Sequence, residues 1–284
     1  MTVNYVGYRL AQWLSLGLPP PVAFRCAEQL ADVQWRRAND DRHAVQANLE
    51  LVLGTSVPEG SPLVREVFRN FGRYLVEFFT IHRVREPEVH VEGYEHLMSA
   101  QHRNRGTILL TAHLGNWELG AVFIRRMGFP VAAVALPHED PRMDRLFNRQ
   151  RQRCGVHVIP LGKDATKRSL RSLRDGQMLG ILGDRTFTEH GISMTFCNKN
   201  VVLPRGPATL SLRSQAPVVP TFVIREGRWK FRLCFEQPIE PQTHQTTDTS
   251  VRSLTQMYAA VTERFLKRFP DQWLIFQALG AAHS

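Results

Sequence analysis

The chain predicts an α/β fold, built as a single domain with a largely parallel central sheet flanked by helices. Short apolar runs alternate along it with longer segments in which apolar side chains recur at helical spacing. Strands that alternate with helices in this way predict βαβ units, and therefore parallel strands. With 284 residues, 43% hydrophobic and 22% charged, the chain suits a globular protein with a large core. An amphipathic helical segment is expected at the N-terminus and a helix at the C-terminus.

Residues 1–88 are predicted to be helical and to form a membrane-interface region ahead of the α/β core at 89–284. An aromatic-rich amphipathic segment ends at the prolines of 19–21, and helices are expected over 22–53 and 63–81. The amphipathic segment fits a bilayer interface and packing onto the protein's own core equally well. It lacks the basic start and cleavage site of a secretory signal, and no run reaches the roughly 18 apolar residues of a transmembrane helix.

The core elements follow from the apolar runs and their spacing. Strands are predicted over 89–93, 107–111, 130–136, 156–160 and 178–183, with a hairpin over 217–225 and 229–237. Helices are predicted over 114–128, 141–153, 163–175 and 249–268. No internal repeat, linker or low-complexity tract divides them, so one structural domain is the economical interpretation.

A histidine follows the strand at 107–111, on the turn into the next helix, and a carboxylate comes five positions later. These are His113 and Glu118. Ligands bind at the carboxyl ends of strands in open α/β sheets. A histidine held in one tautomer by a carboxylate is a general base for a hydroxyl. A capping or core role for His113, with Glu118 complementing the helix dipole, is the structural alternative, and these residues alone do not choose between the two.

Asp184 and Arg185 follow the strand at 178–183 and should open on the same edge of the sheet as His113. Arg185 suits a phosphate, and Asp184 suits the task of orienting either Arg185 or His113. A surface ion pair at a strand end explains the same two residues.

Arg205 and Gly206 precede Pro207 at an expected helix start. Such a terminus presents backbone N–H groups to an anion, and Arg205 would add a full positive charge. An ordinary structural helix start accounts for the Gly-Pro pair equally well.

The formal net charge of +10 favours anionic partners, among them phospholipid surfaces, nucleic acids and acidic carrier proteins. Much of the excess lies between 142 and 174, where basic residues recur at helical spacing. A nucleic-acid reader usually adds a recognisable module or stacking aromatics, and none is visible in this run. The four cysteines are widely spaced, which argues against zinc and against a disulfide framework.

Taken together, the motifs form an ordered set that covers nearly the whole chain. His113 and Glu118 match an H-x4-D/E pattern. The set continues through 42–49, 70–78, 183–185, 203–208, 215–220 and 270–274. This set resembles the bacterial lipid A biosynthesis (late) acyltransferase family, within the lysophospholipid acyltransferase superfamily. The chain departs from the family pattern at Thr186 and at 196–198. Its lack of a full transmembrane anchor resembles interfacial relatives that acylate mannosylated phosphatidylinositol.

The resemblance implies transfer of a fatty acyl group from an acyl carrier protein or coenzyme A thioester to a hydroxyl of a glycolipid or lysolipid. The reaction would take place at the cytoplasmic face of the bacterial inner membrane, on a peripheral or monotopic protein in contact with anionic lipids. The acyl thioester would be a co-substrate, with no cofactor, no metal and no nucleic-acid partner. A catalytically inactive lipid-binding member and a basic nucleic-acid-binding protein are the alternatives.

The resemblance also implies roles for individual residues. His113 would be the general base, and Glu118 would orient its ring. Oxyanion donors would come from the backbone amides near Gly115 and Asn116. Two arginines would hold phosphate, and two further residues would line the site. The arginines are Arg185 and Arg205, and the lining residues are Asp184 and Gly206.

Overall fold

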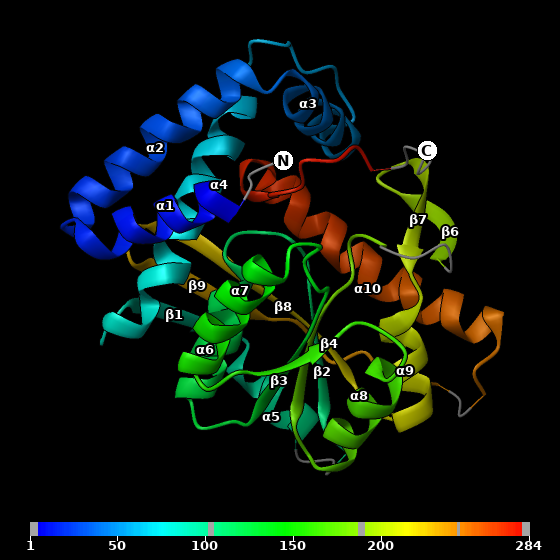
Figure 1. The fold of residues 1–284 in the computed structure, drawn as a ribbon. Coiled ribbons are helices and arrows are strands. Elements are labelled where there is room, and N and C mark those ends of the chain that lie inside the picture. The colour runs from blue at the N-terminus through cyan, green and yellow to red at the C-terminus, as the bar shows by residue number, and fades with distance from the viewer. Residues whose placement is uncertain (1–4, 102–104, 187–190, 243–244, 280–284) are drawn as a thin grey trace.

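The computed structural model describes residues 5–101, 105–186, 191–242 and 245–279. Its centre is a seven-stranded sheet in the order β1-β9-β8-β2-β5-β3-β4 (Figure 1). The strands are β1 (Glu88–Glu92), β2 (Thr107–Thr111), β3 (Val131–Ala135), β4 (His157–Pro160), β5 (Met178–Leu182), β8 (Val218–Gly227) and β9 (Lys230–Phe235). Neighbouring strands run parallel except in the β8–β9 hairpin. The predicted α/β class and largely parallel sheet are therefore confirmed.

Helices cover both faces of the sheet because alternate strand residues point to opposite sides. Leu109 packs with α5 (Tyr94–Gln101) and α6 (Trp117–Arg126). Its neighbours Ile108 and Leu110 pack on the other face. That face is covered by α8 (Ala165–Arg174), α9 (Gly206–Ser214) and α10 (Asp248–Arg268).

Four helices precede the sheet and pack near its carboxyl edge (Figure 1). They are α1 (Tyr5–Gly17), α2 (Pro20–Arg37), α3 (Asn39–Leu53) and α4 (Pro62–Thr80). The aromatic side chains of α4 form a core with Leu146 and Phe147 of α7 (Pro141–Arg153) and with the chain after α10. No helix in the described part of the chain combines the length and apolar character needed to span a membrane.

Local chemistry sets the helix starts. Side chains of Ser61, Asn116, Asp140 and Thr247 accept hydrogen bonds from the first turns of α4, α6, α7 and α10. Proline follows the first and third of these caps, where its missing N–H costs nothing.

The predicted elements are found within a few residues of their expected bounds, with four differences. The single helix expected over 22–53 is two helices, because the chain turns at Ala38 (φ −96°, ψ 80°) and a new helix begins with an acidic first turn. The structure adds α5, and it adds an antiparallel hairpin of β6 (Gly191–Phe196) and β7 (Lys199–Pro204). The helix expected from 114 begins at Trp117.

Candidate active site

The sheet register brings His113 and Asp184 together. Strands β2 and β5 are parallel neighbours in which Thr111 pairs with Leu182, and each functional residue lies two positions beyond its strand. His113 Nδ1 is 3.0 Å from Asp184 Oδ1. The backbone N–H of His113 donates to Asp184 Oδ2 at 2.8 Å, and the indole N–H of Trp273 donates to the same oxygen at 2.9 Å.

This arrangement keeps Asp184 ionised and fixes the ring. Asp184 is fully buried, which by itself would raise its pKa. The His113 ring and the three hydrogen bonds outweigh burial and hold the pKa of Asp184 below its ordinary value. A carboxylate that accepts at Nδ1 keeps the proton on Nδ1 and makes Nε2 the basic nitrogen of the ring.

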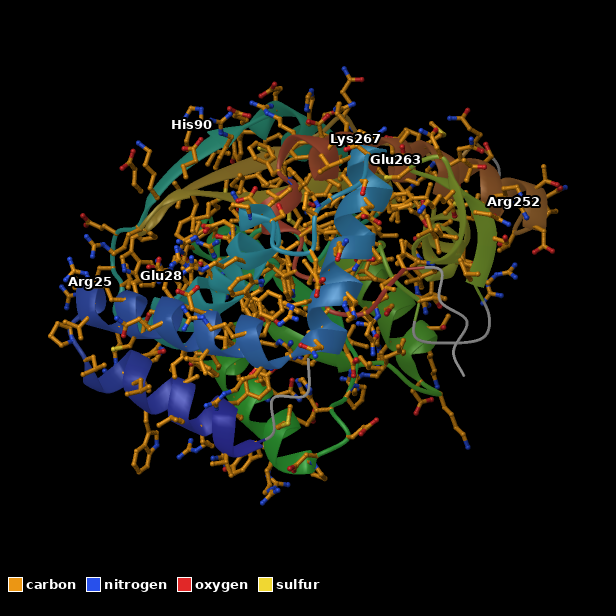
Figure 2. The ribbon with its side chains drawn as sticks, turned by 90° about the horizontal axis from the view of Figure 1, so that it is seen from above. Arg25, Glu28, His90, Arg252, Glu263 and Lys267 are labelled. Carbon is orange, nitrogen blue, oxygen red and sulfur yellow. The ribbon has the colours of Figure 1, made fainter. Side chains whose placement is uncertain are left out.

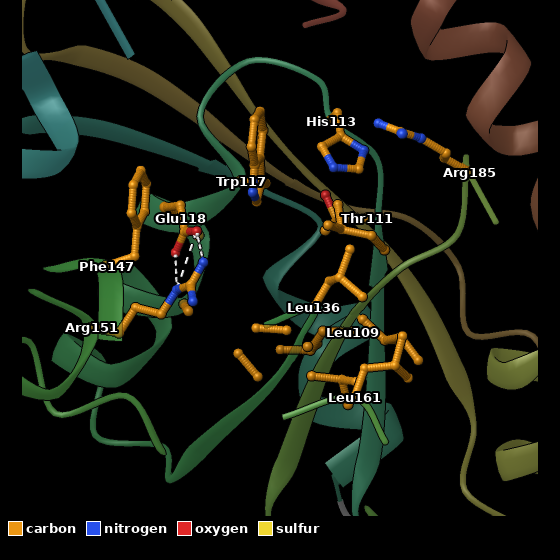
Figure 3. Close-up of a pocket in the computed structure, with 18 of the residues that line it drawn as sticks. Leu109, Thr111, His113, Trp117, Glu118, Leu136, Phe147, Arg151, Leu161 and Arg185 are labelled. Carbon is orange, nitrogen blue, oxygen red and sulfur yellow. Dashed lines mark hydrogen bonds and ion pairs between the residues drawn. The ribbon is translucent and has the colours of Figure 1, made fainter. Parts of the chain in front are cut away.

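Glu118, expected to orient the ring, is held elsewhere. Arg151 of α7 donates through Nη2 to Glu118 Oε1 at 2.6 Å and through Nε to Oε2 at 3.0 Å. Both side chains are largely buried. Burial lowers the pKa of Arg151, but Glu118 outweighs it and leaves that pKa raised. Figure 3 shows Glu118 facing Arg151, with Trp117 between Glu118 and His113. The carboxylate hydrogen-bonded to Nδ1 is therefore Asp184 rather than the expected Glu118.

The turn after His113 requires glycine. Gly115 has φ +62°, and a Cβ placed there would lie 1.8 Å from the carbonyl oxygen of Val223. Its N–H donates to the carbonyl oxygen of Gln272 at 2.8 Å, and the N–H of Asn116 donates to that of Val223 at 3.0 Å. Both amides that were expected as oxyanion donors therefore hold the turn in this structure.

The side chain of Asn116 is also structural. It is fully buried, accepts from the N–H of Leu119 at the start of α6, and donates to Glu77 Oε2 at 2.7 Å. Glu77 in turn accepts from Arg225 in a buried ion pair. Asn116 thus anchors the turn after His113 to α4 and β8.

The His113 ring lines a cavity of about 760 Å³. Small residues in the central strands make room for it, among them Ala133, Ala135 and Gly180. Larger apolar side chains close it, and Figure 3 shows Leu109, Leu136 and Leu161 lying together beyond the ring. The cavity is therefore apolar over most of its wall, with polar groups gathered at the carboxyl edge of the sheet.

Three further predicted residues, Arg185, Arg205 and Gly206, line this cavity. Arg185 is half-buried and lies beside His113 in Figure 3. Burial lowers the pKa of Arg185, although the neighbouring Asp184 opposes the shift. Arg205 forms a 2.6 Å ion pair with Asp248. Gly206 starts α9, as expected from the Gly-Pro pair, and it also lines the cavity.

Sequence reasoning did not identify Trp117, Arg151 or Trp273. Trp117 packs edge-on against the His113 ring at a centroid distance of 4.9 Å. A second histidine, His138, also lines the cavity and packs on Phe147. Within the described ranges, no three His, Cys, Asp or Glu side chains are grouped closely enough to hold a metal ion.

Residues 4–279 match the bacterial lipid A biosynthesis acyltransferase family. The chain is 26% identical over 261 residues to the phosphatidylinositol mannoside acyltransferase of Mycolicibacterium smegmatis, covering 87% of this chain and 82% of that protein. It is also 26% identical over 272 residues to the lipid A biosynthesis palmitoleoyltransferase of Escherichia coli, covering 92% of this chain and 86% of that one.

Among solved structures, the 1-acyl-sn-glycerophosphate acyltransferase of Thermotoga maritima is similar with a TM-score of 0.41 and 17% identity, covering 73% of this chain and 88% of that one. The family match, which spans almost the whole chain, is the informative comparison. The protein therefore belongs to the bacterial lipid A biosynthesis acyltransferase family and is an acyltransferase.

Proposed function

We propose that this protein transfers a fatty acyl group from an acyl carrier protein or coenzyme A thioester to a hydroxyl of a glycolipid or lysolipid. The observation that carries the proposal is the His113–Asp184 pair on the wall of a large, mostly apolar cavity. The cavity has the character needed for a fatty chain, and the pair has the character needed to activate an alcohol. The two curated relatives named above are a phosphatidylinositol mannoside acyltransferase and a lipid A biosynthesis palmitoleoyltransferase, and these names support a glycolipid acceptor.

In this mechanism the acceptor hydroxyl gives its proton to Nε2 of His113 while its oxygen attacks the thioester carbonyl. The tetrahedral intermediate then collapses, the carbon–sulfur bond breaks, and the imidazolium returns the proton to the leaving thiolate. The buried Asp184 carboxylate stabilises the imidazolium between these steps. No covalent enzyme intermediate is required.

The negative charge that develops on the carbonyl oxygen needs a donor other than the Gly115 and Asn116 amides. Arg185 lies beside His113 and carries a planar set of N–H groups. We assign Arg185 to this oxyanion or to a phosphate close to the reacting hydroxyl. Arg205 and the start of α9 lie on the same cavity and suit a second anionic group of the donor or acceptor.

Glu118 acts as a positioning residue in this scheme. Its ion pair with Arg151 ties the first turn of α6 to α7. Trp117, the residue before it, packs against the His113 ring. The Glu118–Arg151 pair therefore holds Trp117 in place against the His113 ring, while Asp184 accepts the hydrogen bond from Nδ1 of that ring.

We place the reaction at the cytoplasmic face of the bacterial inner membrane, with residues 1–88 as the interface region and 89–284 as the α/β core. The support is the glycolipid acceptor class and the helices α1 and α2, which carry exposed apolar side chains. A peripheral or monotopic attachment suits such helices.

The experiment is thioester turnover with acyl carrier protein and coenzyme A donors and a lysolipid or glycolipid acceptor. A general base contributes roughly 10²–10⁴-fold, so His113→Ala should lose about that much. His138→Ala is the matched control, since His138 lines the same cavity but packs on Phe147. Equal turnover by wild type and His113→Ala would exclude the mechanism, and no turnover by either would favour an inactive lipid-binding member.

A further inference from the structure

The outer surface of α1 is apolar, although its inner surface contains buried polar groups. Val6, Leu10 and Trp13 recur at helical spacing and are 70%, 51% and 68% exposed. Gln12 and Ser15 are the buried residues of the same helix. Together with α2, this helix holds six of the eleven large apolar side chains that are exposed in the described part of the chain. Exposed apolar side chains that cluster in this way indicate a binding surface, whereas singly scattered ones do not.

A basic stripe runs along the neighbouring helix α7. Arg142, Arg145, Arg149 and Arg153 lie on one side of the helix and are all exposed. Arg142 pairs with Asp140. The other three form no ion pair or hydrogen bond with any described residue. The stripe therefore presents positive charge to whatever covers this side of the molecule.

The apolar stripe and the basic stripe belong to one continuous surface. The guanidinium of Arg142 lies 4.6 Å from the ring centroid of Tyr5, which joins the start of α7 to the start of α1. Further along the two helices, Tyr8 of α1 packs edge-on against Phe147 of α7, with the ring centroids 5.3 Å apart. Figure 2 shows α1 and α2 along one side of the molecule, with side chains projecting away from it.

The catalytic cavity reaches this surface. Tyr8 from α1 and Phe147 from α7 both line it. Leu136, in the loop that leads from β3 to α7, lines it too and is exposed. A layer of lipid spread over α1 and α7 would therefore meet the cavity where these two helices touch.

We propose that α1 and the basic stripe of α7 form one docking surface for a bilayer rich in anionic phospholipid, with the cavity opening toward that bilayer. The inference rests on the proposed function in so far as a lipid must enter the cavity. The apolar stripe of α1 inserts among the acyl chains, and the arginines of α7 contact the headgroup phosphates. Charge complementarity and the adjoining apolar stripe together favour a lipid surface over an acidic protein.

A second basic stripe provides a matched control. Lys167, Arg171 and Arg174 are exposed on α8, which packs on the opposite face of the sheet beside α9. They also form no ion pair with any described residue. Replacing three basic residues by glutamine on either helix removes the same charge, but only the α7 change alters the proposed surface.

The experiment measures sedimentation of the full chain with vesicles of phosphatidylcholine, alone or mixed with phosphatidylglycerol. Each arginine near an anionic surface contributes roughly fivefold in affinity, so Arg145→Gln/Arg149→Gln/Arg153→Gln should bind mixed vesicles roughly a hundredfold more weakly. The variant Lys167→Gln/Arg171→Gln/Arg174→Gln should stay close to wild type. Added salt should weaken wild-type binding and narrow the difference between the variants.

The apolar half of the surface has its own test. Trp13→Ser should weaken binding to both kinds of vesicle, whereas Met257→Ser, at an exposed apolar position on α10, should not. Equal losses from the α7 and α8 variants would show that only net charge matters and would overturn the proposal. So would an α7 variant that binds vesicles like wild type but fails only with acyl carrier protein as donor, which would assign the stripe to that protein.

These outcomes remain separate from the chemistry. His113→Ala should dock like wild type without turning over. Turnover by an undocked variant with a detergent-solubilised acceptor would leave the proposed function intact and place the failure in docking alone.

Discussion

The carboxylates of Asp184 and Glu118 are both largely buried, but their surroundings give them different tasks. Asp184 lies at the edge of the sheet and accepts hydrogen bonds from neutral donors and the His113 ring. Glu118 lies between α6 and α7 and is neutralised by the full charge of Arg151. A carboxylate that is already paired with an arginine gives little further electrostatic stabilisation to an imidazolium. Asp184 at the sheet edge is therefore suited to chemistry, and Glu118 between the helices is suited to positioning.

The largest effect should come from Asp184→Asn. Oδ2 accepts from two N–H groups, the backbone of His113 and the indole of Trp273. The amide oxygen of asparagine must take that place, which turns its NH₂ group toward Nδ1 of the ring. The ring would then carry its proton on Nε2 and could not act as a base, so turnover should fall by up to about 10⁴-fold with little change in acceptor binding. Steady-state kinetics with separate kcat and KM would check this, and a loss confined to KM would contradict it.

Arg151→Met should act mainly on stability. It leaves the buried Glu118 carboxylate without its cation, which costs about 3–5 kcal/mol of unfolding free energy. Urea unfolding would measure it. The double variant Arg151→Met/Glu118→Gln removes both charges and should recover much of the loss. If the double variant were as unstable as the single one, packing by the arginine stem and not charge would explain the effect.

Trp273→Phe offers a smaller change at the sheet edge. It removes one hydrogen bond to a charged group, worth about 1.5–3 kcal/mol, while most of the ring packing remains. We expect lower stability and a partial loss of turnover, since Asp184 would be held less firmly. If Trp273→Phe lost this much stability but kept its turnover, the indole would stabilise the fold without contributing to the site.

The sequence was sufficient for most of the fold because buried parallel strands are continuous apolar runs. The strand at 107–111 agrees with β2 at both ends. The β6–β7 hairpin is absent from the sequence prediction, although apolar and polar residues alternate from Ile192 to Phe196, a pattern typical of a strand. The break at Ala38 was missed because no proline or glycine marks it.

The sequence indicates only part of the candidate site. A histidine after a buried strand is distinctive, and His113 does line the cavity, but the sequence pattern does not favour Asp184 over Glu118 as its partner. Choosing Asp184 requires the strand order, since β5 lies beside β2 although two strands separate them in sequence. The pair of Glu118 and Arg151 depends on how α6 packs against α7, and no spacing rule gives that contact.

Acid should weaken the contribution of Asp184 to stability, and this effect can be measured. Its pKa is lower in the folded protein than in the unfolded chain, where aspartate titrates at about 3.9. Its contribution to stability is therefore complete above that unfolded value and is lost as the pH falls through the lower folded value. Asp184→Asn should remove the loss of stability that protonation of Asp184 causes at acid pH. The difference in unfolding free energy between wild type and variant should therefore shrink as the pH is lowered below about 4. Urea unfolding at a series of acidic pH values would test it. A difference independent of pH would mean that Asp184 stabilises the fold through its hydrogen bonds alone and carries no linked proton.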